Sequence, residues 1–181
     1  GVIGMAALAI ALPHIEMADD VDMRAELRVL GRPEVLIALA VTVLSSGAMF
    51  TVFTYIAPIL RDATGASNDF ITAMLVLYGL GLTVGNWLGG KFADKSLDGT
   101  LIFVLIALTV LLLIFAVTMQ WAIPAALSIF AWGVATFALV PPVQMRVMTL
   151  AADAPNVASS VNIGAFNMGN AVGAALGGGV I

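Results

Sequence analysis

The chain has 181 residues, of which 61% are apolar and only 10% are charged, whereas soluble domains are about 45 to 50% apolar and about 25% charged. The composition therefore predicts a membrane protein. The net charge of −4 argues against nucleic acid as a partner. The absence of cysteine excludes disulfides and thiolate metal sites. No residue pattern indicates a cofactor.

The chain opens with an apolar segment, residues 1–13, that is too short to cross a bilayer. No basic region precedes it and no methionine begins it, so we interpret it as the end of a span rather than a signal peptide. Residues 14–34 are the only long polar stretch, with Asp19 or Asp20 placed to cap a short helix that ends at Gly31. We interpret this stretch as a solvated linker, the alternative being a site for a regulatory partner.

Four long runs without charge follow, and a helix needs roughly 20 mostly apolar residues to cross a bilayer. The third run, residues 99–145, would make a helix of about 70 Å, which is over twice the hydrocarbon thickness. It must therefore fold back, and Trp121 and Pro124 suit the turn. The sequence predicts five complete spans, at residues 35–60, 70–91, 99–119, 121–146 and 156–181. Both ends of the chain fall in apolar runs, so we expect a fragment of a larger protein.

The basic residues predict the orientation, because cytoplasmic loops are enriched in lysine and arginine. Six of the seven basic residues fall on one side of the predicted spans: Arg24, Arg28, Arg32, Lys91, Lys95 and Arg146. Only Arg61 falls on the other side. We therefore expect the linker at residues 14–34 to be cytoplasmic.

Two spans carry a glycine at every fourth position. These glycine ladders are Gly81, Gly85 and Gly89 in the second span, and Gly169, Gly173 and Gly177 in the last. At about 100° per residue each ladder stays on one narrow face, where the backbone of another helix can approach closely. A static helix pair is one interpretation. The presence of two ladders in one short chain favours a second interpretation, in which the helices slide against their partners at these contacts.

Several segments resemble the major facilitator transporters. The loop "GGKFADKS" is similar to their loop signature at Gly90, Asp94 and Lys95, and departs from it at Leu97 and Asp98. "FTYIAPIL", "VPPVQMRVM" and "SSVNIGAFNMGNAVGAALGG" together resemble the sugar and drug efflux branch, the arabinose-efflux-permease-like members of the twelve-span drug:proton antiporters. The resemblance covers nearly the whole chain.

The resemblance implies an all-α membrane fold, the carboxy-terminal half of a major facilitator transporter. Residues 1–13 would be the end of span six, residues 14–34 the linker between halves, and the five complete spans would be spans seven to eleven, with span twelve missing. The full-length protein would be a monomer in the bacterial inner membrane, working by alternating access. Spans eight and eleven would form the seam with the other half, so the two glycine ladders would be the inter-half seam.

Spans seven and ten line the substrate cavity of such transporters. The resemblance therefore places polar and aromatic candidates there and on span eleven: Met49, Phe50, Phe53, Thr54, Tyr55, Trp132, Thr136, Asn167 and Asn170. Gln144 lies deeper toward the cytoplasm. A neutral set of hydroxyl, amide and aromatic groups suits a sugar or a small amphipathic drug. Packing of the aromatic rings, and hydrogen bonds between helices for the asparagines, are the alternatives.

The resemblance also implies a cytoplasmic gate. Asp94 and Arg146 would belong to a charge relay that latches the outward-facing state, beside Gly90 and Lys95. Free surface charges are the alternative. No charged residue or histidine lies in the body of any predicted span, whereas proton relays normally need one. A proton site would therefore belong to the missing half, and proton coupling is implied by the resemblance alone.

Two other classes of membrane protein are alternatives to a transporter. An intramembrane protease needs aspartates within its spans or a buried histidine, but the spans hold no aspartate and the only histidine, His14, lies in the linker. We therefore expect no enzyme. A channel or a non-transporting membrane scaffold is the remaining alternative.

Overall fold

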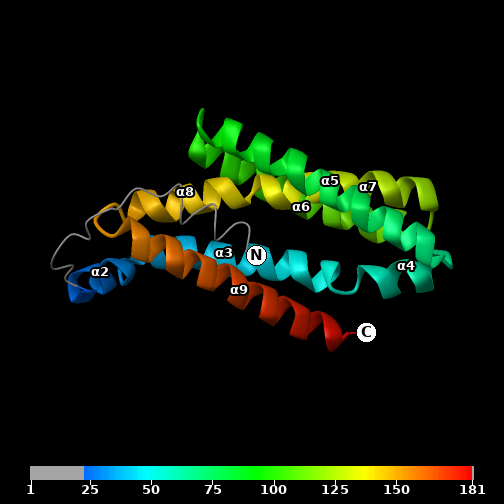
Figure 1. Ribbon diagram of the computed structural model, residues 1–181, viewed down its shortest axis with the longest axis horizontal. Helices are drawn as coiled ribbons and strands as arrows, with labels where there is room; N and C mark the ends of the chain where they lie inside the picture. Colours follow the sequence, from blue (N-terminus) through cyan, green and yellow to red (C-terminus); the bar gives the residue numbers. More distant parts are fainter. Residues whose placement is uncertain (1–22, 181) are drawn as a thin grey trace, which may run out of the picture.

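The computed structural model describes residues 23–180, which fold entirely into helices and turns with no strand in that range (Figure 1). The helices are α2 (Met23–Leu30), α3 (Pro33–Phe53), α4 (Ile56–Thr64), α5 (Asn68–Ala93), α6 (Leu97–Thr118), α7 (Ala122–Ala138), α8 (Val140–Leu150) and α9 (Pro155–Gly178). The all-α prediction is confirmed. The predicted end of span six, His14 and most of the linker lie outside the described residues.

The first predicted span, residues 35–60, is divided into α3 and α4. Pro58 has no N–H to donate to the carbonyl of Thr54, one turn earlier, so the helical ladder is interrupted there. The backbone of Thr54 still continues α3 by donating to Phe50 O, and Tyr55 adopts a non-helical ψ of 12° before α4 begins. Gly65 ends α4 with a φ of 64°, a left-handed conformation that glycine adopts without steric cost.

The fourth predicted span, residues 121–146, is longer than predicted and also divided. α7 and α8 meet at Leu139, and the two run on in the same general direction toward Leu150 (Figure 1). The division falls where Pro141 and Pro142 remove two consecutive N–H donors from the helical ladder. The prediction missed the division because both prolines sit within an unbroken apolar run.

In the part of the chain that the structure describes, four helical segments are long and apolar enough to cross a membrane: Pro33–Phe53, Asn68–Ala93, Leu97–Thr118 and Ala122–Leu150. They match four of the five predicted spans. The fifth, α9, has 24 residues but is not among the four. Its glycines, serines and asparagines lower its mean hydropathy, so its role as a span stays a prediction.

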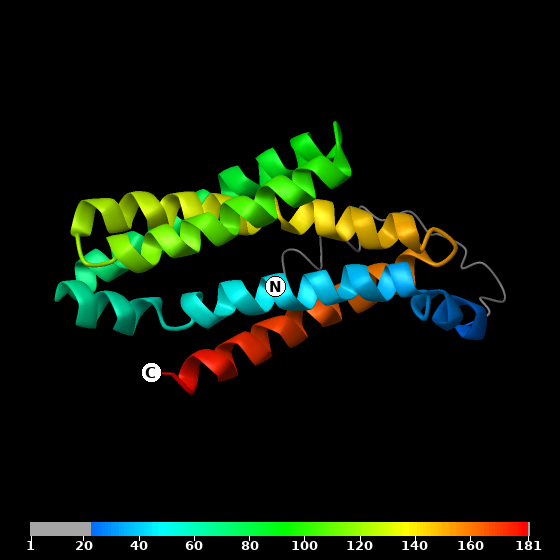
Figure 2. The same ribbon diagram turned by 180° about the vertical axis from the view of Figure 1, so that it is seen from behind.

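Two helix pairs make the most extensive contacts in the described part of the chain, α5 with α7 and α3 with α9. α3 and α9 lie side by side along one edge of the molecule, and α5, α6 and α7 form the opposite edge, in both views (Figures 1 and 2). α8 continues α7 and closes the space between the two groups at the end near α2.

The glycine ladder of α5 packs on α7. A Cβ at Gly81, Gly85 or Gly89 would overlap backbone carbonyl oxygens of the partner helix, those of Phe130, Val134 and Ala138 respectively. All three glycines are buried. This face is therefore occupied by α7 within the described residues, and its predicted role as a seam with another half stays a prediction.

The ladder of α9 packs in the same way on α3. A Cβ at Gly169, Gly173 or Gly177 would overlap backbone atoms at Val43, Gly47 and Thr51 respectively. The seam with another half stays a prediction for this ladder too. Both ladders form tight helix pairs inside one unit, which is the static interpretation of the glycine pattern.

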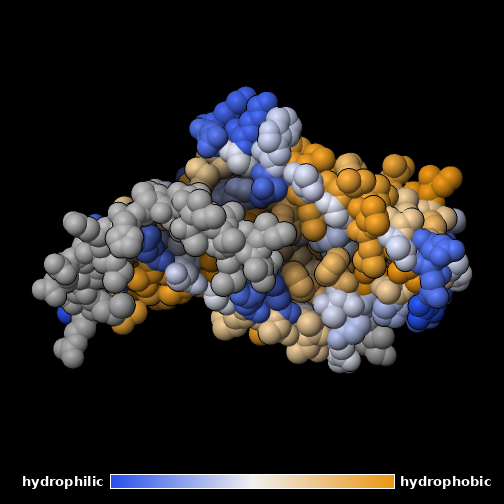
Figure 3. Space-filling model, in the orientation of Figure 1, coloured by the Kyte–Doolittle hydropathy of each residue, from blue (hydrophilic) through white to orange (hydrophobic). Residues whose placement is uncertain are grey.

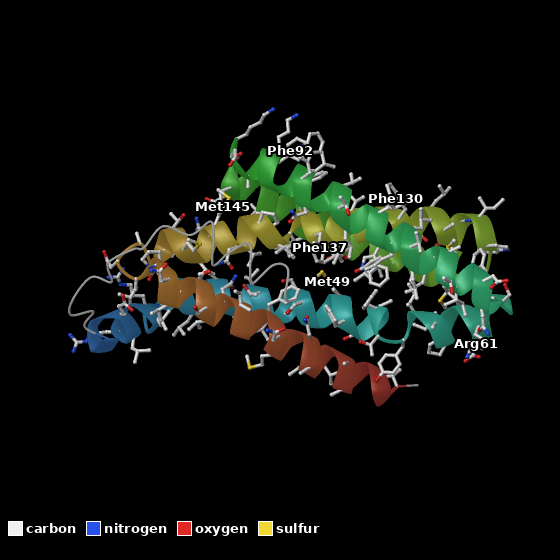
Figure 4. All side chains as sticks on the ribbon, viewed as in Figure 1. Met49, Arg61, Phe92, Phe130, Phe137 and Met145 are labelled. Carbon is white, nitrogen blue, oxygen red and sulfur yellow. The ribbon has the colours of Figure 1, made fainter. Side chains whose placement is uncertain are left out.

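The ends of the helices differ in charge as the topology prediction requires. Five of the basic residues among the described side chains lie on α2, at the start of α3, at the end of α5, at the α5–α6 turn or on α8: Arg28, Arg32, Lys91, Lys95 and Arg146. Arg61 lies at the opposite end of the molecule, on α4 (Figure 4). Hydrophobic residues cover most of the face between the hydrophilic ends (Figure 3).

Candidate functional site

A cavity of about 170 Å³ lies between α3, the α7–α8 junction and α9. Met49 on α3 and Phe137 on α7 face one another across it (Figure 4). Its lining residues carry no ionisable side chain: Thr42, Ser45, Met49, Phe137, Leu139, Val140, Val143, Gln144, Asn162, Ile163 and Phe166. The cavity therefore suits a neutral molecule.

A chain of side-chain hydrogen bonds runs along the polar side of this cavity. Thr42 Oγ1 donates to Asn162 Oδ1 at 2.7 Å, and Asn162 Nδ2 donates to Gln144 Oε1 at 2.7 Å. Gln144 Nε2 then donates to Ser159 Oγ at 2.6 Å. The chain, which we call the amide network, joins α3, α9 and α8, which are three of the four helices that surround the cavity.

Among the polar side chains that line the cavity, a free N–H or O–H donor remains only on an amide. The single hydroxyl protons of Thr42 and Ser45 are both taken, by Asn162 or Ala38 O for Thr42, and by Val41 O or Thr42 O for Ser45. The Asn162 amide has two N–H groups and gives one to Gln144, and a carbonyl oxygen such as Gln144 Oε1 has a second lone pair. A ligand in the cavity would meet one amide donor, the second N–H of Asn162, and two amide acceptors, the remaining lone pairs of Asn162 Oδ1 and Gln144 Oε1.

Six aromatic rings form a continuous series next to the cavity, and its far end is Phe115 on α6, which stacks on Trp132 with ring centroids 5.8 Å apart. Phe50 packs edge-on against Phe166, with ring centroids 6.3 Å apart, and against Phe53 at 5.7 Å. Phe53 stacks on Tyr78 at 4.9 Å, and Tyr78 contacts Trp132 at 4.9 Å. Each such pair contributes about 0.5 to 1.5 kcal/mol beyond its buried area. The series fixes α3, α5, α7 and α9 relative to one another.

The structure brings only one of the nine predicted cavity residues, Met49, into the lining of this cavity. Phe50, Phe53 and Trp132 belong to the aromatic series, with Trp132 fully buried. Tyr55 donates its hydroxyl to Ala174 O at 2.8 Å and so joins α3 to α9. The cavity lies nearer the start of α3 than predicted.

The remaining predicted cavity residues differ in how far their side chains are exposed. Thr54 and Asn167 are exposed. Thr136 is 2% exposed and Asn170 is half-buried. Among the described residues, neither Trp132 Nε1 nor Asn170 Oδ1, both buried, has a hydrogen-bond partner. Thr136 Oγ1 also makes no hydrogen bond of ordinary geometry among the described residues, although the Tyr78 side chain lies close to it.

The sequence analysis missed Thr42, Ser45 and Asn162 as lining residues and gave Gln144 only a secondary place. A signal was available, because a polar side chain in an apolar helix tends to find a polar partner on a neighbouring helix. Which partner it finds depends on the relative rotation of α3, α8 and α9, and the sequence pattern does not specify that rotation.

The predicted gate is arranged differently from the prediction. Arg146 pairs with Asp98 at 2.9 Å instead of with Asp94, because Asp98 begins α6 close to α8 while Asp94 ends α5. Asp94 and Lys95 are exposed and make no ion pair in the described part of the chain. A Cβ at Gly90 would meet nothing within 4 Å. A relay between Asp94 and Arg146 is therefore not formed in this structure.

Comparison with known proteins gives a family match over residues 1–178, to the Major Facilitator Superfamily. The inner membrane transport protein YdhP of Escherichia coli is 53% identical over the whole chain, which covers 46% of that relative. The MFS-type transporter YtbD of Bacillus subtilis is 31% identical over 98% of the chain and 46% of the relative. A probable sugar efflux transporter of Helicobacter pylori is 32% identical over 98% of the chain and 47% of the relative. The chain thus spans about half the length of the curated relatives it matches.

Proposed function

Because the chain belongs to the Major Facilitator Superfamily, we propose that it is part of a secondary transporter that moves a neutral small molecule across a bacterial inner membrane by alternating access. The relatives named as an inner membrane transport protein and a sugar efflux transporter support the location and the efflux direction. The observation that carries the proposal is the cavity between α3, α7, α8 and α9, whose lining has no ionisable side chain.

The cavity wall supports a neutral substrate with a small number of polar groups. Buried charges need a paired partner, and a charged substrate would find none among the lining residues. Asn162 and Gln144 offer one amide donor and two amide acceptors, while the rest of the wall is mostly apolar. Ligand pockets commonly combine an apolar wall with a few placed polar groups in this way.

The amide network supplies a candidate for the contact that changes during the transport cycle. It joins α3 and α9 to α8 at one side of the cavity, so a change in the position of α8 would break the bond between Asn162 and Gln144. A substrate that satisfies both amides would replace that bond. Substrate binding and the opening of the network would then be linked, which is the coupling that alternating access requires.

Proton coupling is a finer part of the proposal. The described portions of α3, α5, α6, α7 and α9 have no charged residue or histidine away from their ends, whereas proton relays in membranes use such groups. We place the proton site in the part of the protein outside this chain. Coupling would make efflux depend on an imposed proton gradient.

The test uses the full-length protein in proteoliposomes that contain a pH-sensitive dye, with an imposed proton gradient and three probes: arabinose, neutral chloramphenicol and cationic ethidium. Transport of a neutral probe, measured with the radiolabelled compound, is the expected result, and dye response would establish coupling. Asn162→Leu should reduce that transport more than Thr109→Val, which changes an exposed position on α6. Transport of ethidium alone would refute the neutral substrate, and binding without transport would favour a non-transporting scaffold.

A further inference from the structure

A second hollow lies outside the substrate cavity, in a groove between α5, α6 and α7 with a volume of about 510 Å³. Its floor is the small-residue face of α7, which includes Ala131, and its sides are formed by α5 and α6. None of its lining residues lines the substrate cavity. The groove therefore needs an explanation of its own.

The groove is graded from polar to apolar along α6. Lys95 and Ser96 lie at one end, at the α5–α6 turn, and the lining continues through Phe103 to Leu111 with apolar side chains. Phe92 at the end of α5 flanks the polar end (Figure 4). Hydrophilic residues gather at that end of the α5–α6 pair, and hydrophobic residues cover much of the face beyond it (Figure 3). An occupant must have a polar head and an apolar body.

The length of the groove matches one layer of a membrane. From Ser96 to Leu111 the helix α6 rises by about 22 Å at roughly 1.5 Å per residue. A bilayer with its headgroup regions is about 40 to 45 Å thick, so one leaflet measures about 20 to 22 Å. The groove thus extends from the headgroup region to the middle of the bilayer, along a single leaflet.

The charge at the polar end favours an anionic head. Lys95 is exposed and makes no ion pair within residues 26–180, and Lys91, one turn earlier on α5, lies 4.9 Å from the ring centre of Trp87. Of the two nearby carboxylates, that of Asp98 is paired with Arg146, and only Asp94 remains unpaired. Two free ammonium groups against one free carboxylate leave a net positive charge, and basic side chains at a membrane surface attract anionic lipid.

We propose that this groove is a binding site for one anionic phospholipid of the cytoplasmic leaflet. The phosphate lies at Lys95 and an acyl chain fills the groove over Ala131 between Phe103 and Leu111. The positive-inside distribution of the basic residues puts the α5–α6 turn on the cytoplasmic side, which is the leaflet whose anionic lipids face Lys95.

The experiment is native mass spectrometry of the full-length protein, purified in a mild detergent and incubated with phosphatidylglycerol. Wild type should retain one phosphatidylglycerol, and Lys95→Ala should retain at least threefold less, while Lys95→Arg restores retention because it keeps the charge. Ala107→Phe should also abolish retention, since Ala107 lines the groove. The matched control is Ala116→Phe on the same helix, which is exposed and lies outside the groove lining.

Three results would overturn the proposal. Equal retention by wild type, Lys95→Ala and Ala107→Phe would place the lipid elsewhere or nowhere. Equal loss in Ala107→Phe and Ala116→Phe would show that bulk on α6, and not the groove, matters. Retention of zwitterionic phosphatidylethanolamine as strong as that of phosphatidylglycerol would remove the argument from charge. Lys95→Arg guards against a folding defect, because restored retention requires a folded protein.

Discussion

Replacing the glycine at the centre of the α5–α7 contact should destabilise the protein, while replacing another glycine on the same helix should not. A Cβ at Gly85 would overlap Val134 O, which is backbone and cannot rotate away. A Cβ at Gly79 would meet nothing within 4 Å. Gly85→Ala and Gly79→Ala therefore make the same chemical change in opposite surroundings.

The expected magnitude follows from the difference between the two variants. Each gains up to about 1 kcal/mol because alanine favours helix over glycine, and this gain cancels in the comparison. Gly85→Ala alone forces α5 and α7 apart, and overpacking of this kind costs about 1 to 3 kcal/mol. Gly85→Ala should therefore have a free energy of unfolding about 1 to 3 kcal/mol below that of Gly79→Ala.

The assay is reversible unfolding of the full-length protein in mixed micelles with increasing mole fraction of SDS, followed by near-ultraviolet circular dichroism. The pair Gly169→Ala and Gly164→Ala repeats the comparison on α9, where the first position meets Val43 O and the second meets open space. If both members of each pair unfold at the same SDS fraction, the close backbone contacts do not hold these helices together and the static interpretation is refuted.

Two further predictions concern polar contacts. Thr42→Val should lower the free energy of unfolding by about 0.6 kcal/mol, the mean for a hydrogen bond between membrane helices. Thr109→Val should leave the free energy of unfolding unchanged, because the Thr109 hydroxyl donates only within α6. If SDS titrations show equal effects of the two variants, the amide network does not stabilise the protein. Asp98→Asn should shift the ratio of inward-facing to outward-facing molecules by up to about fivefold, since an exposed ion pair contributes about 0 to 1 kcal/mol. Asp94→Asn should shift this ratio less, because Arg146 pairs with Asp98. Spin-label distance distributions would measure both ratios, and a larger shift in Asp94→Asn would contradict the pairing.

The positions of four spans could be predicted because they depend on one-dimensional quantities. The length of a charge-free run and the thickness of a bilayer suffice to place a helix, and the turn near Trp121 follows from the excess length of one run. The interruption at Leu139 did not follow, because a proline can end a helix or only interrupt its ladder, depending on what packs around it.

The candidate site could be predicted only in kind. Neutral, amide-bearing and aromatic residues were expected and are present, but the aromatic ring of Trp132 turns into the core while Asn162 and Gln144 line the cavity. A glycine ladder likewise predicts that some backbone comes close without identifying which one. Both failures have one cause, since the rotation of each helix about its axis is fixed by all of its neighbours together.

The interruption at Leu139 would let α8 tilt as a rigid body relative to α7. α7 is held to α5 by three backbone contacts at glycines, so it serves as the fixed part. α8 has 11 residues and measures about 16 Å, so each 10° of tilt at Leu139 would carry its far end by about 3 Å. Gln144 and Arg146 lie on α8 and would move with it, whereas their partners lie on α9 and α6. A bend of this size at one residue would therefore open the floor of the cavity and separate the surface ion pair in a single movement.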